Sequence, residues 1–326
     1  MYDSITSLEN LYASWREFQN GKRYKNDVAV FSRNLDVHIY NLHQELKGKS
    51  YAHSAYEAFK INDPKPRDIH KALVRDRLLH HAIYRVLYPF FDAKFIYDSY
   101  SCRMGKGTHK AMERFRVFSR KVSRNNTRTC HILKCDIRKF FASIDHDILK
   151  QILAKHVNDR DTLALLGNII DSFNTEGRKN IGLPLGNLTS QLLVNVYMNK
   201  FDQFVKHTLK AKYYIRYADD FVFLSEDKIY LETLISIISD FLESRLKLAL
   251  HPDKVYIKTL ASGVDFLGWV HFPHHRVLRT ATKRRMMRNL AKNGHKEETV
   301  QSYVGMLGHG NAHKIIRDIT DATYSK

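Results

Sequence analysis

The sequence predicts an α+β protein whose helices cover one face of a small antiparallel sheet. A short apolar run at 131–137 indicates a buried strand, and the segment 213–225, apolar on both sides of an acidic centre, indicates two strands joined by a tight turn. An amphipathic pattern at 231–248 predicts a helix, which leads to a further strand pattern at 255–260. Together with helical patterns between 146 and 206, this order matches a β-α-β-β-α-β arrangement.

The chain before this sheet is predicted to be mostly helical. Helical patterning extends to about Tyr51, with a polar interruption near 20–22. Two strands then flank a turn that contains Pro64 and Pro66, because proline favours turns and cannot donate to a sheet. Apolar residues at helical spacing predict the next helix over 75–91.

Turn and capping residues separate the remaining elements. A basic helix follows the glycines at 105 and 107, and another helix begins near 146 with Ser143 or Asp145 as its cap. The other predicted elements are helices at 161–174 and 189–206, a strand-rich segment at 264–272, and helices beyond Arg276.

Composition excludes several classes of protein. The 326 residues are 44% hydrophobic and 27% charged, which is ordinary for a globular protein and excludes a disordered chain. No apolar run approaches the roughly 18 residues of a membrane span, and the first residues lack the apolar core of a signal peptide. Cys102, Cys130 and Cys135 form no paired motif, so we expect free thiols and a cytoplasmic protein.

The charge predicts an acidic partner. Lys and Arg number 53 against 34 Asp and Glu, a formal charge of +19. Two stretches concentrate the excess: 103–128 has nine basic residues and one acid, and 276–326 has eleven and four. Solvated helix faces are the alternative for either stretch, but two stretches on either side of an acidic centre favour nucleic acid. The expected contacts are Arg103, Lys106, Lys110, Lys283, Arg284 and Arg285.

Three aspartates stand at predicted strand ends among apolar residues. Asp136 ends one strand, and Asp219 and Asp220 occupy the tip of the predicted hairpin. Crowded carboxylates repel one another and lose hydration, so such a cluster persists when protonated or bound to cations. Mg²⁺ prefers oxygen ligands, and two ions about 3.5–4 Å apart can activate a 3′-hydroxyl and steady a leaving pyrophosphate. We expect Asp136 and Asp219 to bridge two ions and Asp220 to be a secondary ligand or an orienting group; for a lone strand-end Asp, capping is the alternative.

Five segments follow one another along the chain: KCDIRKFFASIDH (134–146), GLPLGNLTSQLLVNVY (182–197), YYIRYADDF (213–221), the region of Lys254, and FLGW (266–269). This is the order of reverse-transcriptase palm motifs, and the chain resembles this family over about residues 55–310. The resemblance implies a right-hand polymerase with fingers, a ferredoxin-like palm sheet and a short α-helical thumb. The implied boundaries are 1–52 for an N-terminal helical segment, 53–130 for fingers and fingers/palm, 131–272 for the palm, and 273–326 for the thumb.

The resemblance also assigns roles to single residues. It implies RNA-directed DNA polymerisation with two Mg²⁺ ions, for which Mn²⁺ could substitute, and the backbone carbonyl of Ile137 as a further ligand. Phe141 matches the ring that excludes a ribose 2′-hydroxyl, with plain packing as the alternative, and Lys254 matches the lysine that protonates or neutralises pyrophosphate. The implied dNTP-binding residues are Lys65, Arg67, Phe141, Leu185, Gly186, Gln191 and Lys254. The implied primer grip is Phe266, Leu267, Gly268 and Trp269.

Within the family, the chain looks most like the reverse transcriptases of diversity-generating retroelements. Retron and group II intron enzymes usually have Gln before the Gly of GNLTSQ (186–191) and Ser-Pro after it, whereas this chain has Leu185 and Gln191. Loss of a polar contact at Leu185 predicts weak base discrimination and mutagenic copying. The resemblance implies a structured template RNA, a DNA or RNA primer, dNTPs, and a small basic accessory protein bridged by RNA. It also implies a prokaryotic or phage-encoded retroelement protein without membrane contact.

Two alternatives remain open. An active reverse transcriptase could serve phage defence with the same chemistry, and gene neighbourhood would separate that role from diversification. A polymerase-shaped RNA-binding scaffold without activity is the third reading, and the intact Asp136, Asp219 and Asp220 argue against it.

Overall fold

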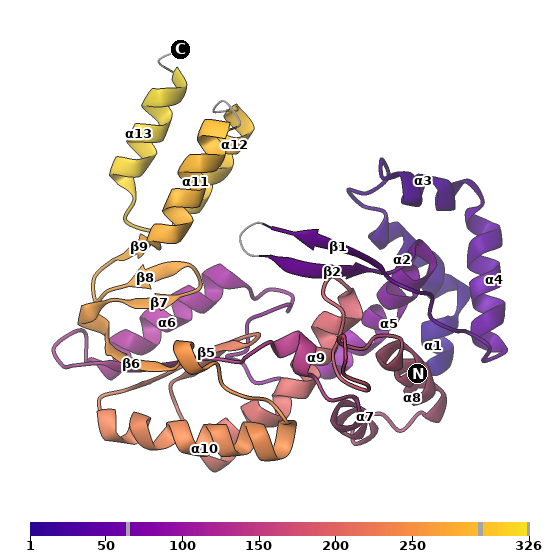
Figure 1. Cartoon of the computed structure of the whole chain (residues 1–326), viewed down its shortest axis with the longest axis horizontal. Coiled ribbons are helices and arrows are strands. Elements are labelled where there is room, and N and C mark those ends of the chain that lie inside the picture. The colour runs from indigo at the N-terminus through magenta and orange to yellow at the C-terminus, as the bar shows by residue number, and fades with distance from the viewer. Residues whose placement is uncertain (63–65, 293–295, 325–326) are drawn as a thin grey trace. The chain divides into compact units, whose positions relative to one another are not determined.

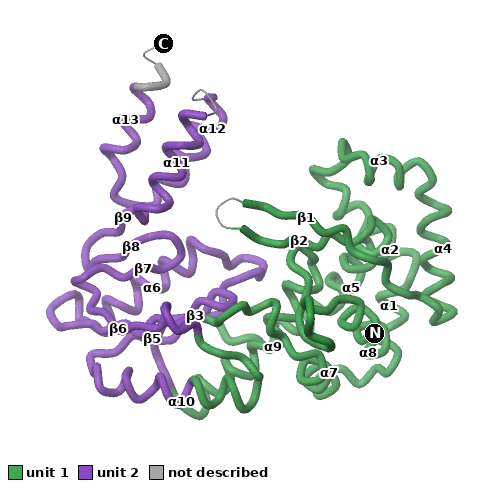
Figure 2. Tube along the Cα trace, in the orientation of Figure 1, with its two compact units in different colours: residues 1–97, 137–210, 239–250 green, residues 98–136, 211–238, 251–326 purple. Residues whose placement is uncertain are grey.

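The computed structural model describes residues 1–62, 66–292 and 296–324. The chain forms two compact units (Figure 2): unit 1 comprises residues 1–97, 137–210 and 239–250, and unit 2 comprises residues 98–136, 211–238 and 251–326. None of the helices in these described ranges is both long and apolar enough to cross a membrane. The three cysteines are free thiols, as predicted.

Unit 1 contains the helices and the hairpin predicted for the first half of the chain (Figure 1). Helix α2 packs on α5, and its buried Phe18 ring meets the His81 ring of α5 edge to face with centroids 5.4 Å apart. Ser7 caps α2 by accepting from the amide of Asn10. The elements are α1 Tyr2–Thr6, α2 Leu8–Phe18, α3 Asn26–Arg33, α4 Leu35–Lys47, β1 Glu57–Ile61, β2 Arg67–Lys71, α5 Val74–Asp92, α7 His146–Ala154, α8 Arg160–Asp171, α9 Leu188–Gln203 and a π-helical turn Phe204–Thr208.

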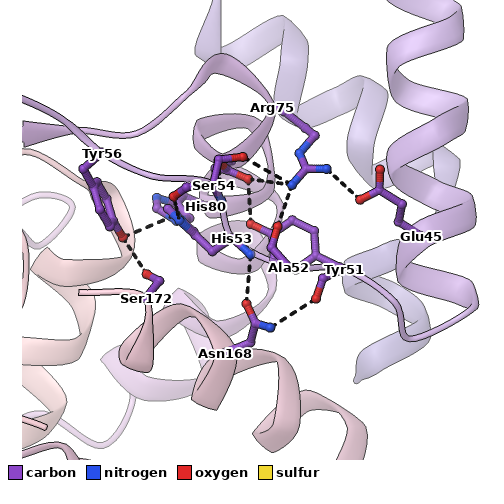
Figure 3. A network of polar contacts seen from close by, with 11 residues as sticks. Glu45, Tyr51, Ala52, His53, Ser54, Tyr56, Arg75, His80, Asn168 and Ser172 are labelled. Atoms are coloured by element: carbon purple, nitrogen blue, oxygen red, sulfur yellow. Dashed lines mark hydrogen bonds and ion pairs between the residues drawn. The ribbon is translucent and has the colours of Figure 1, made fainter. Parts of the chain in front are cut away.

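A buried polar network fixes the segment that leads into the β1–β2 hairpin (Figure 3). Asp76, fully buried near the start of α5, accepts from the Tyr51 hydroxyl at 2.8 Å and from the Ser54 amide at 3.2 Å. The Asn168 side chain of α8 donates to the Tyr51 carbonyl and accepts from the His53 amide, each at 3.1 Å. These hydrogen bonds join the base of the hairpin to α5 and α8. They also give Asp76 the partners without which a buried carboxylate is costly.

Asp145 is the cap of α7, one of the two residues that the sequence allowed. Its carboxylate accepts from the Ile148 amide at 3.0 Å and pairs with Lys247 at 2.6 Å. Burial opposes ionisation, but the hydrogen bond and charge of Lys247, with the α7 amides, hold the pKa of Asp145 below its ordinary value. This stabilisation is therefore present above the usual carboxyl pKa and is lost as pH falls through the lowered value.

We expect Asp145→Asn to lower the free energy of unfolding by about 1 kcal/mol at neutral pH. The loss is small because solvent around the exposed Lys247 screens the ion pair and because Asn can still cap the helix. Urea denaturation at several pH values measures this difference, which should shrink towards zero as pH falls below the usual carboxyl range. Asp147→Asn, an exposed acid in the same helical turn, is the matched control. A pH-independent difference would contradict the ion-pair explanation.

Unit 2 is built on a four-stranded antiparallel sheet, the palm sheet, in the order β4-β5-β3-β6. Its strands are β3 His131–Asp136, β4 Tyr214–Tyr217, β5 Asp220–Ser225 and β6 Tyr256–Thr259, with α10 Lys228–Leu246 between β5 and β6 in the chain. Within this sheet, the first strand along the chain, β3, is central, and the second, β4, is at an edge. This is the order of a ferredoxin-like sheet, and it confirms the predicted arrangement.

Helix α6 (Thr108–Val122) packs on the palm sheet. Its Phe115, Phe118 and Val122 share a buried cluster with Ile132 of β3 and Val222 of β5. Because side chains alternate along a strand, Ile132, Lys134 and Asp136 lie on this same face of the sheet. The cluster therefore supports the face that carries the acids.

The C-terminal part of unit 2 contains a second sheet and a helical group. The sheet has the order β7-β8-β9, with β7 Val264–Phe266, β8 Trp269–His271 and β9 Arg276–Leu278. The prediction of helix directly beyond Arg276 was wrong for three residues, because Leu278 pairs with Trp269 and is buried against it. Helices α11 Thr280–Lys292, α12 Glu297–Leu307 and α13 His313–Tyr324 follow, with Met286, Leu290, Val300, Leu307 and Ile319 in a common core.

Candidate active site

The two strands that the sequence singled out place their acids side by side. Asp136, the last residue of β3, is directly opposite Asp220, the first residue of β5. Asp219 precedes Asp220 in the turn of the β4–β5 hairpin and is half-buried. The predicted convergence of Asp136 with the hairpin tip is therefore confirmed, although they lie more than 80 residues apart in the chain.

A buried arginine holds the hairpin turn. Ala218 has a left-handed conformation with φ of 55°, which is unfavourable for a residue with a β-carbon. Arg216, fully buried, donates from Nη1 to the Ala218 carbonyl at 3.1 Å and from Nη2 to the Ser99 hydroxyl at 3.0 Å. The sequence analysis missed this residue; the signal was an arginine inside an apolar strand, where a charge needs partners.

Two lysines face the acids. Lys134, on the same face of β3 as Asp136, donates to Asp220 Oδ2 at 3.0 Å, and Lys254 donates to Asp136 Oδ1 at 2.8 Å. Lys254 lies in the 3₁₀ turn Pro252–Lys254, beside the His251 amide that donates to the Asp136 carbonyl at 2.8 Å. The structure thus brings Lys254 to the acids, as expected for a site residue, and adds Lys134, which the sequence analysis did not select.

Burial and mutual repulsion of the acids oppose ionisation of Asp220 in spite of the two lysines. Burial raises the pKa of Asp220 to about 6 against the lowering effect of Lys134, and the charges of Asp219 and Asp136 add to the rise. The second oxygen of Asp220, Oδ1, is buried and accepts no hydrogen bond. An oxygen-seeking cation would relieve the repulsion and supply the partner that Oδ1 lacks, so these residues fit Mg²⁺.

The acids are not arranged as a complete metal centre. Within the described ranges, no three His, Cys, Asp or Glu side chains are close enough together to hold a metal ion. Asp136 and Asp220 are instead engaged by Lys254 and Lys134. Ile137, whose carbonyl was the further expected ligand, is buried next to Asp136 in the chain.

The residues expected to bind a dNTP lie mostly in unit 1. Gly186 has a φ of 107°, and a β-carbon there would be 3.2 Å from Ile69 of β2, so glycine suits this position. The neighbouring Leu185 accepts through its carbonyl from the His70 amide at 3.2 Å, which ties this motif to the hairpin. Arg67, the first residue of β2, is exposed. Lys65 lies outside the described residues.

Phe141 and Phe140 differ in burial. Phe140 is buried, whereas Phe141 is partly exposed, and their rings meet edge to face with centroids 5.6 Å apart. Both lie in the 3₁₀ turn Phe140–Ser143, and the Phe141 carbonyl accepts from the Leu183 amide at 2.8 Å. Phe140 is therefore the core residue of the pair, and the Phe141 ring retains a surface for contact with a ligand.

A cavity of about 420 Å³ in unit 1 adjoins the GNLTSQ motif. Three of its polar lining atoms are buried without a hydrogen-bond partner: Asn187 Oδ1, His80 Nδ1 and Arg77 Nε. Unpaired buried polar atoms are costly, so their presence favours a polar ligand. Burial lowers the pKa of His80 to about 3, so its ring is neutral. Asn187, His80 and Arg77 were not among the site residues expected from the sequence, although Asn187 lies inside the GNLTSQ motif. Gly186 and Gln191, which were expected, also line the cavity.

The primer-grip segment forms a two-residue hairpin turn between β7 and β8. Leu267 and Gly268 both have positive φ, 52° and 86°, which suits the twist of a tight hairpin. Phe266 and Trp269 are buried on either side, in separate hydrophobic clusters. Leu267 is partly buried and packs against both clusters, so the turn is fixed to the core of unit 2.

The basic residues expected to contact nucleic acid are all in unit 2. Arg103 donates to the Ser99 carbonyl at 3.0 Å, and the Lys106 ammonium lies 5.1 Å from the Tyr100 ring centroid. The remaining ones, Lys110 on α6 and Lys283, Arg284 and Arg285 on α11, lie on helix surfaces. None of the six is buried, which leaves them accessible to a phosphate backbone.

Solved structures with a similar fold include telomerases. The apo telomerase of Candida tropicalis has a TM-score of 0.54 and 12% identity, with 68% of this chain and 48% of that chain covered. The telomerase of Candida albicans in complex with a TWJ fragment of telomeric RNA has a TM-score of 0.53 and 12% identity, with 72% and 48% covered. At this identity the likeness shows the mixed α+β polymerase fold alone.

Sequence relatives agree with the fold. Protein YkfC of Escherichia coli is 24% identical over 300 residues, which cover 80% of this chain and 76% of that protein. A putative COX1/OXI3 intron 2 protein of Saccharomyces cerevisiae is 20% identical over 256 residues, and the match covers only 29% of its length. Residues 60–271, well over half of the chain and inclusive of the acids, match the family described as reverse transcriptase (RNA-dependent DNA polymerase). The chain belongs to the reverse transcriptase family.

Proposed function

We propose that the protein copies an RNA template into DNA by adding dNTPs to a primer 3′-hydroxyl at the acids of the palm sheet. The observation that carries this proposal is the cross-strand pairing of Asp136 with Asp220 beside Asp219, on a fold that belongs to RNA-dependent DNA polymerases. Asp136, Asp219 and Asp220 would hold two Mg²⁺ ions, whose positive charge supplies hydroxyl activation and stabilises the phosphates.

The chain's own residues account for the rest of the chemistry. Lys254 is 2.8 Å from Asp136 and in the proposed reaction turns its ammonium to the departing pyrophosphate, where it neutralises charge or donates a proton. Lys134 and Arg216 are positioning residues: one orients the Asp220 carboxylate and the other the turn that carries Asp219. The Leu267–Gly268 turn is the proposed primer contact.

Primer extension on an RNA template tests the proposal directly. We expect Mg²⁺-dependent incorporation of dNTPs, with Mn²⁺ as a substitute, and strong loss of RNA binding as salt is raised. Absence of extension on both RNA and DNA templates, by protein that binds RNA, would instead favour the inactive scaffold.

We further propose that the enzyme is error-prone and serves a diversity-generating retroelement. The support is Leu185 before Gly186 and the sequence GNLTSQ, together with the orphan polar atoms of the cavity beside that motif. A structured template RNA and a small basic accessory protein bridged by that RNA belong to this proposal. Phage defence with the same chemistry is the alternative, and a template and variable repeat beside the gene would separate the two.

We expect Leu185→Gln to lower misincorporation by about ten-fold, because a polar side chain next to Gly186 can pair with the nucleotide only in the correct geometry. Single-nucleotide incorporation opposite each template base measures the ratio of wrong to right kcat/KM. Leu185→Met retains an apolar side chain and is the matched control. Equal, low error rates in the wild type and Leu185→Gln would reject the error-prone assignment.

A further inference from the structure

A second polar cavity, of about 430 Å³, lies in unit 2 and has no part in the proposed active site. Three segments line this cavity, which we call the histidine recess: α6 near Arg116, the β8–β9 turn at 272–275 with Arg276, and residues 308–313, which are the loop after α12 and the first residue of α13. The palm acids and the Leu267–Gly268 turn are not among its lining residues. Its volume is in the range of about 300–1,000 Å³ that small-molecule ligands occupy.

The recess is rich in cationic and imidazole side chains. Arg116 and Arg276 supply guanidinium groups, and four exposed histidines, at 274, 275, 309 and 313, supply ring nitrogens. The acid among the lining residues is Glu113, which pairs with Arg116. This composition favours a ligand with phosphate groups, because guanidinium and imidazole N–H groups donate to phosphate oxygens.

The recess also offers flat rings. Phe272 and His275 are stacked, with centroids 4.9 Å apart and planes at 15°, and His109 stacks on His309 at 3.7 Å. His275 and His309 are exposed, so their pairs extend to the surface of the recess. Aromatic rings beside cations are the arrangement with which proteins bind single-stranded nucleic acid, since bases stack on the rings while cations hold the backbone.

Specific contacts build the walls of the recess. Arg276 donates to the His309 carbonyl and accepts through its own carbonyl from the Asn311 amide at 2.8 Å. Gly310 allows this approach, because a β-carbon there would lie 2.0 Å from the Trp269 ring. On the other side, Asn126 donates to the Pro273 carbonyl at 3.2 Å and ties the β8–β9 turn to the end of α6. The loop, the turn and the helix are therefore held together as one site.

We propose that the histidine recess binds a single-stranded stretch of RNA outside the primer–template duplex, with phosphates on Arg116 and Arg276 and bases stacked on His275 and His309. The surface of α6 extends the site, because Arg120 and Lys121 follow Arg116 on its exposed side. The inference rests on the proposed function in one respect, namely that the strand is the unpaired part of the template.

The test compares two RNA–DNA primer–template duplexes, one blunt and one with a single-stranded RNA tail of a dozen nucleotides, by fluorescence anisotropy. We expect Arg116→Ala with His275→Ala to raise the Kd for the tailed duplex about ten-fold and to leave the Kd for the blunt duplex unchanged. The slope of log K against log salt for the tailed duplex should fall by about one. The control is Lys228→Ala with His207→Ala, which removes a helix-surface lysine paired with Glu232 and an exposed imidazole elsewhere.

Three results would overturn the inference: equal weakening on both duplexes, no weakening on either, or a matching loss in the control. Competition with AMP distinguishes a bound strand from a bound free nucleotide. If AMP displaces the tailed duplex as readily as an RNA oligonucleotide does, the proposal of a bound strand is rejected. Primer extension by the wild type is scored separately on the tailed duplex, whose RNA strand continues beyond the primer 3′ end and so provides a template to copy. A tail preference without extension would reject the proposed polymerase and retain the RNA site, whereas extension without a tail preference would do the reverse.

Discussion

Replacement of Asp136 or Asp219 by Asn should reduce dNTP incorporation by about three orders of magnitude or more, because each removes a carboxylate charge that the proposed ions require. Without metal, neither variant should lose thermal stability, because relief of repulsion offsets the loss of the Lys254 ion pair in Asp136→Asn. Asp136, Asp219 and Asp220 repel one another, and burial with this repulsion already raises the pKa of Asp220. Single-turnover primer extension and thermal melting with and without Mg²⁺ measure the two effects.

The control for both variants is Asp253→Asn, which removes a highly exposed acid next to Lys254 in the chain. We expect it to retain wild-type extension and the wild-type shift of Tm on addition of Mg²⁺. Full activity in Asp219→Asn, or an unchanged Mg²⁺ shift in Asp136→Asn, would refute the assignment of these acids as metal ligands. A loss of Tm in either variant without metal would contradict the repulsion argument.

Replacement of Phe141 by Ala should reduce the preference for dNTPs over NTPs by about a hundred-fold or more, because the side chain that we propose to meet the 2′-hydroxyl becomes small. The partly exposed position of this ring, against the buried Phe140, is what leaves it available for such a contact. The ratio of kcat/KM for dCTP and CTP on one template measures the preference.

Phe141→Tyr keeps the ring and should keep the preference, so it separates exclusion by size from general damage to the turn Phe140–Ser143. The kcat/KM for dCTP should change by less than the kcat/KM for CTP in the Ala variant. An unaltered ratio in Phe141→Ala would mean that the ring only packs, which is the alternative that the sequence allowed.

The elements of the fold were largely predictable from local pattern. Short apolar runs indicated β3 and the β4–β5 hairpin, because strands that are buried along their length are apolar throughout. The helical spacing of apolar residues indicated α5 and α10, because burial of one helix face imposes that spacing. The miss at β9 has a local cause. Arg276–Leu278 is too short for periodicity to define, and it forms a strand because Leu278 fills the core beside Trp269.

The residues of the site likewise divide into those that the sequence indicated and those that it did not. Asp136, Asp219 and Asp220 stood out because carboxylates at the ends of apolar strands are costly without a cation. Arg216 and Lys134 did not stand out, since their roles depend on a turn carbonyl and on a neighbouring strand. The unpaired atoms of Asn187 and His80 were equally invisible, because burial and the lack of a partner are properties of the packed chain.

By itself, the sequence determined the kinds of element, the excess positive charge and the three acids, because period, composition and motif order are written along the chain. Only the tertiary structure decided that Asp136 faces Asp220, that Lys254 and Lys134 engage them, and that arginines and histidines from three separate segments line one recess. The physical reason is that strand register and the approach of distant segments are set by packing across the whole unit, which no local pattern encodes.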